Sequence, residues 1–203
     1  MPTILDLDTG RGPARATVHH AAAPAALVVL LHGAGTDTAA APYPELADAL
    51  AAAGLTAVRF DQPYRVAGRR APDRARFLDA ALVEALPALH ALAPGCPLGV
   101  VGRSSGARVA CRTAAAAGTR AIVALGFPWR PPGTPPRPDR GDELRLGART
   151  CPVLVVQGER DPFGRPTRLR GVRTRTVAGM AHAPTLPAAL GTIGWLARTL
   201  AQA

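Results

Sequence analysis

The chain has 203 residues, with 24 basic against 14 acidic side chains, a formal charge of +10 and an apolar share of 48%. Lys and Asn do not occur, so every basic residue is Arg, and serine occurs only at Ser104 and Ser105. This length and composition exclude a disordered chain and predict a single domain over residues 1–203. The longest apolar run, Ala25 to Leu31, is too short to cross a bilayer, which argues against a membrane-spanning protein.

The N-terminus has neither the cationic start nor the long apolar segment of a secretory signal, so we expect a cytoplasmic protein. The cysteines are odd in number and show no C-x-x-C spacing, which argues against a disulfide framework and a zinc site. We therefore interpret Cys96, Cys111 and Cys151 as small core residues.

A high positive charge is typical of proteins that bind nucleic acid. In this chain the arginines run from Arg11 to Arg198 with acids among them, aromatic residues are few, and no nucleic-acid-binding motif is visible. Direct nucleic-acid binding would rest on charge alone. We therefore expect neither a nucleic-acid nor a membrane partner, and treat the net charge as weak evidence about partners.

The N-terminal residues 1–24 predict an antiparallel hairpin at the edge of a sheet, because Thr3 to Leu7 and Ala14 to His20 flank Thr9-Gly-Arg-Gly12. From Leu27 onward, short apolar runs alternate with longer alanine-rich segments, a pattern typical of parallel strands joined by crossover helices. The expected parallel strands are Ala25 to Leu31, Leu55 to Phe60, Pro97 to Gly102, Ala121 to Gly126, Val153 to Gln157 and Val172 to Val177.

Helices are expected between the strands, over Pro44 to Ala53, Pro72 to Ala93 with a kink at Pro87, Ser105 to Ala117, and Pro187 to Leu200. The segment Trp129 to Arg149 contains five prolines, so we expect an ordered irregular loop there. No segment is long enough for a large cap domain. The fold class is therefore α/β, with a mostly parallel sheet between two helix layers.

A nucleophile motif stands where the strand Pro97 to Gly102 gives way to a helix. Gly102-Arg-Ser-Ser-Gly106 fits G-x-S-x-G, the elbow that exposes a serine hydroxyl on a sharp strand-to-helix turn. Ser104 is the expected nucleophile. Read alone, it is also compatible with a helix N-cap.

A serine nucleophile needs a base and a third group that orients the base. Only His182 follows the elbow among the five histidines. The acids that lie between them are Asp139, Asp142, Glu143, Glu159 and Asp161. Asp161 is favoured because it follows the strand Val153 to Gln157 at the same sheet edge, and Glu159 is the reserve; taken singly, His182 could be a loop residue and Asp161 a turn former.

An acyl-transfer site also needs donors for the developing oxyanion. Leu31-His-Gly-Ala-Gly35 follows the first parallel strand, so we expect the N–H groups of Ala34 and Ser105 to form the oxyanion hole. His32 is interpreted as a residue that bonds the backbone and shapes this turn rather than as a catalytic group. His19, His20 and His90 have no partners at ligand spacing and are treated as structural or surface residues.

With these residues in place, the chain resembles the α/β-hydrolase superfamily, in particular a small dienelactone-hydrolase-like family that includes a testis-expressed protein and a subunit of the NSL histone-acetyltransferase complex. The resemblance runs from about Leu27 to Leu200. Its most specific segments are Leu125-Gly-Phe-Pro-Trp-Arg-Pro-Pro-Gly133 and Gln157-Gly-Glu-Arg-Asp-Pro-Phe-Gly164. It implies a three-layer α/β-hydrolase sandwich with a Ser104, Asp161 and His182 triad.

The elbow departs from the family's usual Ser-Met-Gly-Gly-Arg, because Ser105 and Ala107 replace Met and the second Gly. The usual serine after the histidine is also missing, since Ala183 follows His182. Neither difference removes a catalytic group, although the first can alter the oxyanion geometry.

The leading hypothesis is a serine hydrolase that acts on a small ester or thioester without metal or organic cofactor. The alternative is a non-catalytic protein-interaction module that retains the hydrolase fold. We expect a shallow pocket roofed by the Trp129 to Arg149 loop and the Gln62 to Pro72 loop. Arginines of these loops, with Arg65 among them, are either anion-binding or simply solvated surface residues; the candidate substrate-binding residues are Arg69, Arg70, Trp129 and Arg130.

Overall fold

The computed structural model describes residues 1–135 and 137–203, so Pro136 of the predicted proline-rich loop lies outside the described residues. Within the described residues, eight strands form one sheet in the order β1-β2-β4-β3-β5-β6-β7-β8. The pairing is antiparallel from β1 through β2 to β4, and parallel from β4 to β8, as expected for a hairpin edge on a parallel sheet. The strands are β1 Thr3–Leu7, β2 Ala14–His19, β3 Ala26–Leu31, β4 Leu55–Asp61, β5 Leu98–Arg103, β6 Thr119–Leu125, β7 Val153–Gly158 and β8 Val172–Val177.

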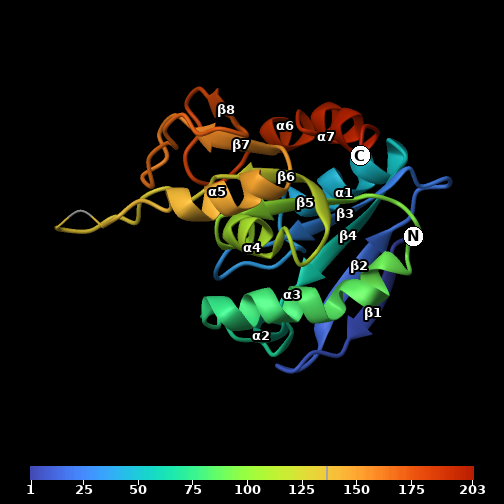
Figure 1. The fold of residues 1–203 in the computed structure, drawn as a ribbon. Helices are drawn as coiled ribbons and strands as arrows, with labels where there is room; N and C mark the ends of the chain where they lie inside the picture. The colour runs from blue at the N-terminus through green and yellow to red at the C-terminus, as the bar shows by residue number, and fades with distance from the viewer. Residues whose placement is uncertain (136) are drawn as a thin grey trace.

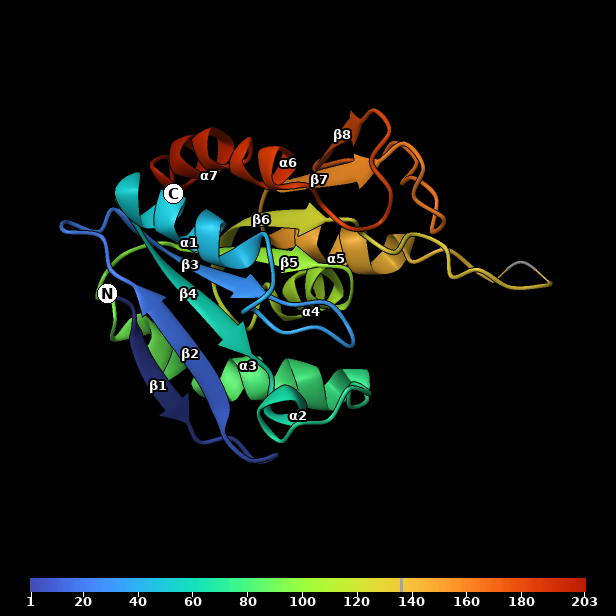
Figure 2. The ribbon, with the colours of Figure 1, turned by 180° about the vertical axis from the view of Figure 1, so that it is seen from behind.

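Helices cover both faces of this sheet (Figures 1 and 2). The helices are α1 Tyr43–Ala52, α2 Pro63–Val66, α3 Ala75–His90, α4 Ser105–Thr113, α5 Gly141–Thr150, α6 Leu186–Leu190 and α7 Ile193–Leu200. One core layer joins α3, α4 and α5 to the sheet, and the other joins α1, α6 and α7 to its opposite face. The expected three-layer α/β-hydrolase sandwich without a large cap is confirmed. No helix in the described parts of the chain is long and apolar enough to span a membrane.

The central strands are buried because they are apolar on both faces. Every residue of β3 and β7 is buried, which confirms the interpretation of their continuous apolar runs. Side chains of β3 alternate between the two cores, since Val29 and Leu31 face one layer and Val28 and Leu30 the other. Cys111 and Cys151 are buried and Cys96 is half-buried, all three as free thiols. Burial raises the pKa of the Cys151 thiol to about 11.

Two predicted loops contain helices. The prediction of an irregular loop over Trp129 to Arg149 is wrong for its second half, where α5 begins at Gly141. The prolines end at Pro138, two acids stand in the first helical turn, and Leu144 and Gly147 pack into the core. The predicted loop from Gln62 to Pro72 contains the single-turn helix α2, which Pro63 starts.

The ends of other helices also differ from the sequence prediction, and the helix predicted over Ser105 to Ala117 ends at Thr113 as α4. The predicted helix Pro187 to Leu200 is divided into α6 and α7, because the chain leaves the first helix at Gly191. Helix α3 begins only at Ala75 because Arg74 is extended, with φ −59° and ψ 149°. Pro87 lies inside α3, which continues to His90.

The carboxyl ends of the parallel strands meet at one edge, from which the described parts of the segment between β6 and α5 project away from the body in both views (Figures 1 and 2). The turn after β3, the elbow after β5 and the loops after β6, β7 and β8 all leave from this edge. The topology therefore brings the candidate catalytic residues to one place although they span most of the chain.

Candidate active site

Ser104 occupies a sharp turn between β5 and α4. Its backbone is left-handed, with φ 50° and ψ −110°, and it is the only non-glycine residue of the described chain with a positive φ. A Cβ on Gly102 would overlap the backbone of Gly106 and Ala107, and a Cβ on Gly106 would lie 2.5 Å from the Leu31 carbonyl oxygen. Both flanking glycines are therefore required by close packing. Ser104 occupies the N-cap position of α4, but its side chain makes no capping hydrogen bond and contacts His182 instead.

The three residues predicted to form the triad lie in one hydrogen-bonded row. Ser104 Oγ lies 2.9 Å from His182 Nε2, and His182 Nδ1 lies 2.9 Å from Asp161 Oδ2. A carboxylate accepts hydrogen bonds, so the His182 Nδ1–H donates to Asp161 and leaves Nε2 free to accept the Ser104 proton. The Asp161 side chain is fully buried, whereas that of His182 is 21% exposed. This arrangement can activate a serine nucleophile.

Asp161 is fixed by donors other than His182. The Phe163 N–H donates to Asp161 Oδ1 over 2.9 Å, and the Gln157 side-chain amide donates to Oδ2 over 2.8 Å. The same amide reaches the Phe127 and Gly164 carbonyls, so it joins the ends of β6 and β7 to the acid. Sequence reasoning missed Gln157, although a polar residue at the end of the apolar run Val153-Leu-Val-Val156 was the available signal.

The other acids between the elbow and the histidine have different partners. Glu159, the reserve choice, is exposed and accepts the Gly179 N–H over 3.0 Å. Asp139 accepts the Gly141 N–H at the start of α5, and Asp142 pairs with Arg145. Of the candidate acids, Asp161 is therefore the one hydrogen-bonded to His182.

The histidine loop is seated directly on strand ends that carry no side chain. Gly126, with φ +59°, follows β6, and a Cβ there would lie 2.5 Å from the His182 carbonyl oxygen. Gly158 ends β7, and a Cβ there would overlap the carbonyl oxygens of Met180 and Ala181. The absence of two side chains thus allows the histidine loop to approach the sheet edge.

The turn predicted to supply an oxyanion donor lies beside the nucleophile. A Cβ on Gly33 would lie 3.4 Å from the Ser104 Cβ, and Ala34 and Gly35 form the turn itself, with Gly35 at φ +71°. Ala34 is exposed, and Ser105 is the first residue of α4. Ala34 thus follows directly on the residue that approaches Ser104, and Ser105 follows Ser104 itself.

His32 bonds the backbone of this turn and of the neighbouring strand end, as predicted from the sequence. Its Nδ1–H donates to the Gly33 carbonyl over 2.9 Å, and its Nε2 accepts the Gln62 N–H over 3.1 Å. The second bond requires a neutral ring, because a protonated Nε2 could not accept. Burial lowers the pKa of His32, which favours that neutral form.

The candidate substrate-binding residues have dissimilar surroundings. Arg69 forms a bidentate pair with Asp73, at 2.9 Å for both contacts, and the backbone oxygen of the exposed Arg70 lies near Gly35. Trp129 is only 4% exposed and packs in the core. Arg130 is exposed and lies 3.8 Å from an Asp139 carboxylate oxygen.

Phe163 connects the acid turn to both His182 and the projecting segment. Its ring lies against the His182 ring with centroids 4.4 Å apart, and its carbonyl accepts the Arg130 N–H over 2.8 Å. A cavity of about 400 Å³ lies beside it. The residues lining this cavity include Trp129, Arg130, Phe163 and Arg165.

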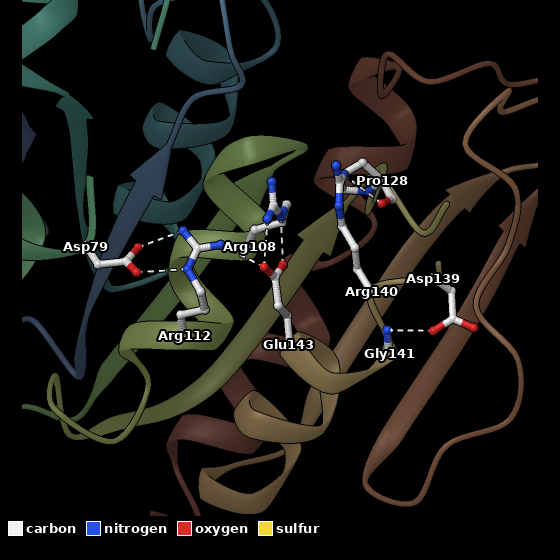
Figure 3. Close-up of polar contacts among 8 residues, drawn as sticks. All are labelled: Asp79, Arg108, Arg112, Pro128, Asp139, Arg140, Gly141 and Glu143. Carbon is white, nitrogen blue, oxygen red and sulfur yellow. Dashed lines mark hydrogen bonds and ion pairs between the residues drawn. The ribbon is translucent and has the colours of Figure 1, made fainter. Parts of the chain in front are cut away.

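A network of ion pairs ties the elbow helix to its neighbours (Figure 3). Arg108, one turn after Ser104, forms a bidentate pair with Glu143 of α5, both contacts at 2.7 Å. Arg112 donates to the same carboxylate at 3.1 Å and forms a bidentate pair with Asp79 of α3. Burial raises the pKa of the Glu143 carboxyl, but Arg108 and Arg112 outweigh burial and hold that pKa below its usual value.

The network also anchors the start of the projecting segment. Arg140, immediately before α5, donates from its backbone to the Trp129 carbonyl over 2.9 Å and from its guanidinium to the Pro128 carbonyl over 3.0 Å (Figure 3). Because the Arg130 N–H donates to the Phe163 carbonyl, a continuous set of bonds joins α4, which follows the nucleophile, to the turn that carries Asp161. Sequence reasoning did not identify Glu143 as a partner of Arg108.

This fold and geometry agree with a comparison of protein families. The sequence profile of the alpha/beta hydrolase domain matches residues 24–183. The chain belongs to this family. No protein of curated function is significantly similar in sequence.

Solved structures share the fold of this alpha/beta hydrolase domain. A serine hydrolase without a lid from Xanthomonas campestris is 22% identical, with a TM-score of 0.72, over 97% of this chain and 94% of that chain. Dienelactone hydrolase from Anabaena variabilis is 18% identical, with a TM-score of 0.71, over 98% and 96%. Est1E from Butyrivibrio proteoclasticus, with ferulic acid bound, is 14% identical, with a TM-score of 0.71, over 97% and 99%.

Removing the Glu143 charge should loosen the segment that the ion-pair network anchors. We expect Glu143→Gln to lower the free energy of unfolding by about 1–3 kcal/mol and to speed amide hydrogen exchange in residues 127–135 and 137–140. Asp79→Asn is the matched control, because it removes the pair with Arg112 and keeps the pair between Arg108 and Glu143. Equal exchange in that segment for both variants would contradict the anchoring.

The buried neutral His32 should make stability depend on pH. Its folded pKa lies below the unfolded value of 6.5, so the unfolded chain binds the extra proton first and stability falls as the pH drops below about 6.5. We expect the free energy of unfolding to depend less steeply on pH in His32→Gln. The difference in slope should reach at most about 1.4 kcal/mol per pH unit. Denaturant melts at several pH values between neutral and mildly acidic measure this; parallel curves for the two proteins would refute it.

Proposed function

We propose that this protein is a serine hydrolase that cleaves an ester or thioester through an acyl-enzyme. The observation that carries the proposal is the row of two 2.9 Å contacts from Ser104 through His182 to the buried Asp161. The strained backbone of Ser104 adds support, since such strain is maintained where it positions a reacting group. The fold likeness to a lidless serine hydrolase agrees with this chemistry.

In the proposed reaction, the Ser104 Oγ attacks the carbonyl carbon while its proton passes to His182 Nε2. Asp161 keeps the ring in the Nδ1–H tautomer and stabilises the imidazolium. The carbonyl oxygen becomes an oxyanion, which the N–H groups of Ala34 and Ser105 would stabilise. His182 then returns the proton to the leaving oxygen or sulfur, and the acyl-enzyme forms.

Deacylation repeats the same steps with water as the nucleophile. His182 takes a proton from water, the hydroxide adds to the acyl carbon, and collapse of the second tetrahedral intermediate releases the acid and Ser104. Each proton that His182 accepts is returned within the cycle.

The cavity beside Phe163 is the proposed substrate pocket. Among the described residues, its lining combines the Trp129 and Phe163 rings with the Arg130 and Arg165 guanidinium groups and includes no acidic side chain. An ester with an apolar body and an anionic group fits this lining. Est1E binds the aromatic acid ferulic acid, which agrees with such a substrate class. Arg70 is retained as a further candidate, whereas Arg69 already pairs with Asp73.

The second candidate function is a protein-interaction module on a retained hydrolase fold. The observation that favours it is the proline-rich segment between β6 and α5, whose described parts extend beyond the carboxyl edge of the sheet in both views (Figures 1 and 2). Polyproline stretches are preorganised for docking to partner proteins. An unreactive Ser104 would favour this function over hydrolysis.

A fluorophosphonate probe separates the two functions, because it labels only activated serines. We expect stoichiometric labelling of the wild type, none of Ser104→Ala, and continued labelling of Ser105→Ala. In His182→Ala, which removes the base, we expect the rate of labelling to fall by at least about a thousandfold. A folded wild type that resists the probe would overturn the hydrolase proposal.

Substrate charge preference tests the pocket. We expect Arg130→Gln combined with Arg165→Gln to lower kcat/KM for carboxylated esters by about tenfold or more and to leave neutral esters nearly unchanged, because a charge-assisted contact contributes about 1.5–3 kcal/mol. Arg69→Gln with Arg70→Gln is measured beside it. If neither pair changes the ratio between the two substrates, these arginines are solvated surface residues.

A further inference from the structure

The positive charge of the chain is concentrated in its C-terminal part. Residues 145–203 contain nine arginines against two acids, a balance of +7. Residues 1–144 contain fifteen arginines against twelve acids, a balance of +3. Arginines are therefore interspersed with acids in residues 1–144, as the sequence analysis described, but not in residues 145–203. A coding bias towards arginine would not explain why the acids are missing from one part only.

The structure gathers six of these nine arginines around the edge strand β8. We call the surface of β8, the segment before it and the facing ends of α5 and α7 the β8 flank. Three hollows of about 500, 410 and 350 Å³ lie on it. Arg149 and Arg170 line the first hollow, Arg165 and Arg168 the second, and Arg173 and Arg198 the third.

These six arginines are exposed and uncompensated. Among the described residues, none of the six forms an ion pair, whereas arginines elsewhere, such as Arg65, Arg108 and Arg112, are paired with carboxylates. The two acids in this part of the sequence have other roles, since Glu159 bonds the Gly179 N–H and Asp161 contacts His182. The flank therefore presents free guanidinium groups to solvent.

We propose that the β8 flank binds single-stranded nucleic acid. Arg and Thr are side chains that contact phosphate oxygens, and Thr167, Thr174 and Thr176 stand among the arginines of the second hollow. In the third hollow Trp195 lies with Arg173 and Arg198. An aromatic ring beside cations is the combination that stacks a base and holds its phosphate.

A membrane surface fits this flank less well. Insertion into lipid requires several apolar side chains beside the cations. Of the large apolar side chains that the described residues expose, Met1 and Ile4 lie in or next to β1 at the opposite edge of the sheet, which leaves Leu146 alone on α5. The guanidinium groups also lie on both faces of β8. This arrangement suits the narrow, extended backbone of a single strand better than a flat membrane surface.

The proposal is tested by fluorescence anisotropy with a labelled oligothymidine of about 20 nucleotides at about 150 mM salt. We expect a Kd of about 10 µM or tighter, and a slope of log K against log salt near −4 for six phosphate contacts. Ser104→Ala is expected to bind equally well, so the result does not depend on the hydrolase proposal.

The variant with Arg168→Gln, Arg170→Gln and Arg173→Gln should bind at least about tenfold more weakly, with a slope near −2. The matched control carries Arg11→Gln, Arg74→Gln and Arg76→Gln, which removes the same charge from exposed positions near α3 and the β1–β2 turn. Circular dichroism verifies that both variants fold. The control should bind like the wild type.

Several outcomes would overturn the proposal. Equal weakening in the two triple variants would show that net charge alone attracts the oligonucleotide. Absence of binding at this salt concentration would contradict a docking surface. If polyglutamate or phosphatidylserine vesicles displace the oligonucleotide at lower charge concentration than unlabelled oligothymidine does, the flank is a surface for an acidic protein or a membrane instead.

Discussion

The close packing of the elbow is the constraint on which the rest of the site depends. Ser104 has a backbone conformation that side chains disfavour, and it is held there because Gly102 lies against the first turn of α4 and Gly106 lies against the end of β3. The same contacts bring the β3 turn beside the nucleophile. Nucleophile placement and the turn proposed for the oxyanion therefore arise from one packing arrangement rather than from two independent loops.

Much of the fold could be predicted from the sequence because its signals are local. Apolar runs identified the six parallel strands, and a glycine-flanked turn identified the hairpin, with bounds that differ from the structure by two residues at most. Glycines at fixed spacing and the order of serine, acid and histidine along the chain pointed to residues that the structure brings into contact. These signals depend on short-range periodicity and on a topology in which strand ends share one edge.

What sequence reasoning missed depends on contacts between distant segments. Proline density predicted a loop through Arg149, but the burial of Leu144 against α4 and β6 favours a helix there, and such burial has no local signature. The pairing of Glu143 with Arg108 joins residues from separate helices. A glutamate or an arginine in the sequence does not by itself show which residue it will pair with. The charge on the β8 flank was visible in the sequence, but only when acids were counted by region and not along the whole chain.

The two glycines under the histidine loop have a consequence for how mutations in this chain are interpreted. Gly126 and Gly158 contact the backbone of the loop that carries His182, so any side chain at either position displaces that loop. A saturation scan scored by activity will therefore rank both glycines with the triad, although neither has a group that reacts. A scan scored by the abundance of folded protein will distinguish these glycines from core residues only if displacement of the loop leaves the sheet folded. Intolerance to substitution at these two positions reflects the space that the histidine loop occupies. Such a scan therefore reveals the residues that shape the site as clearly as it reveals the residues that react.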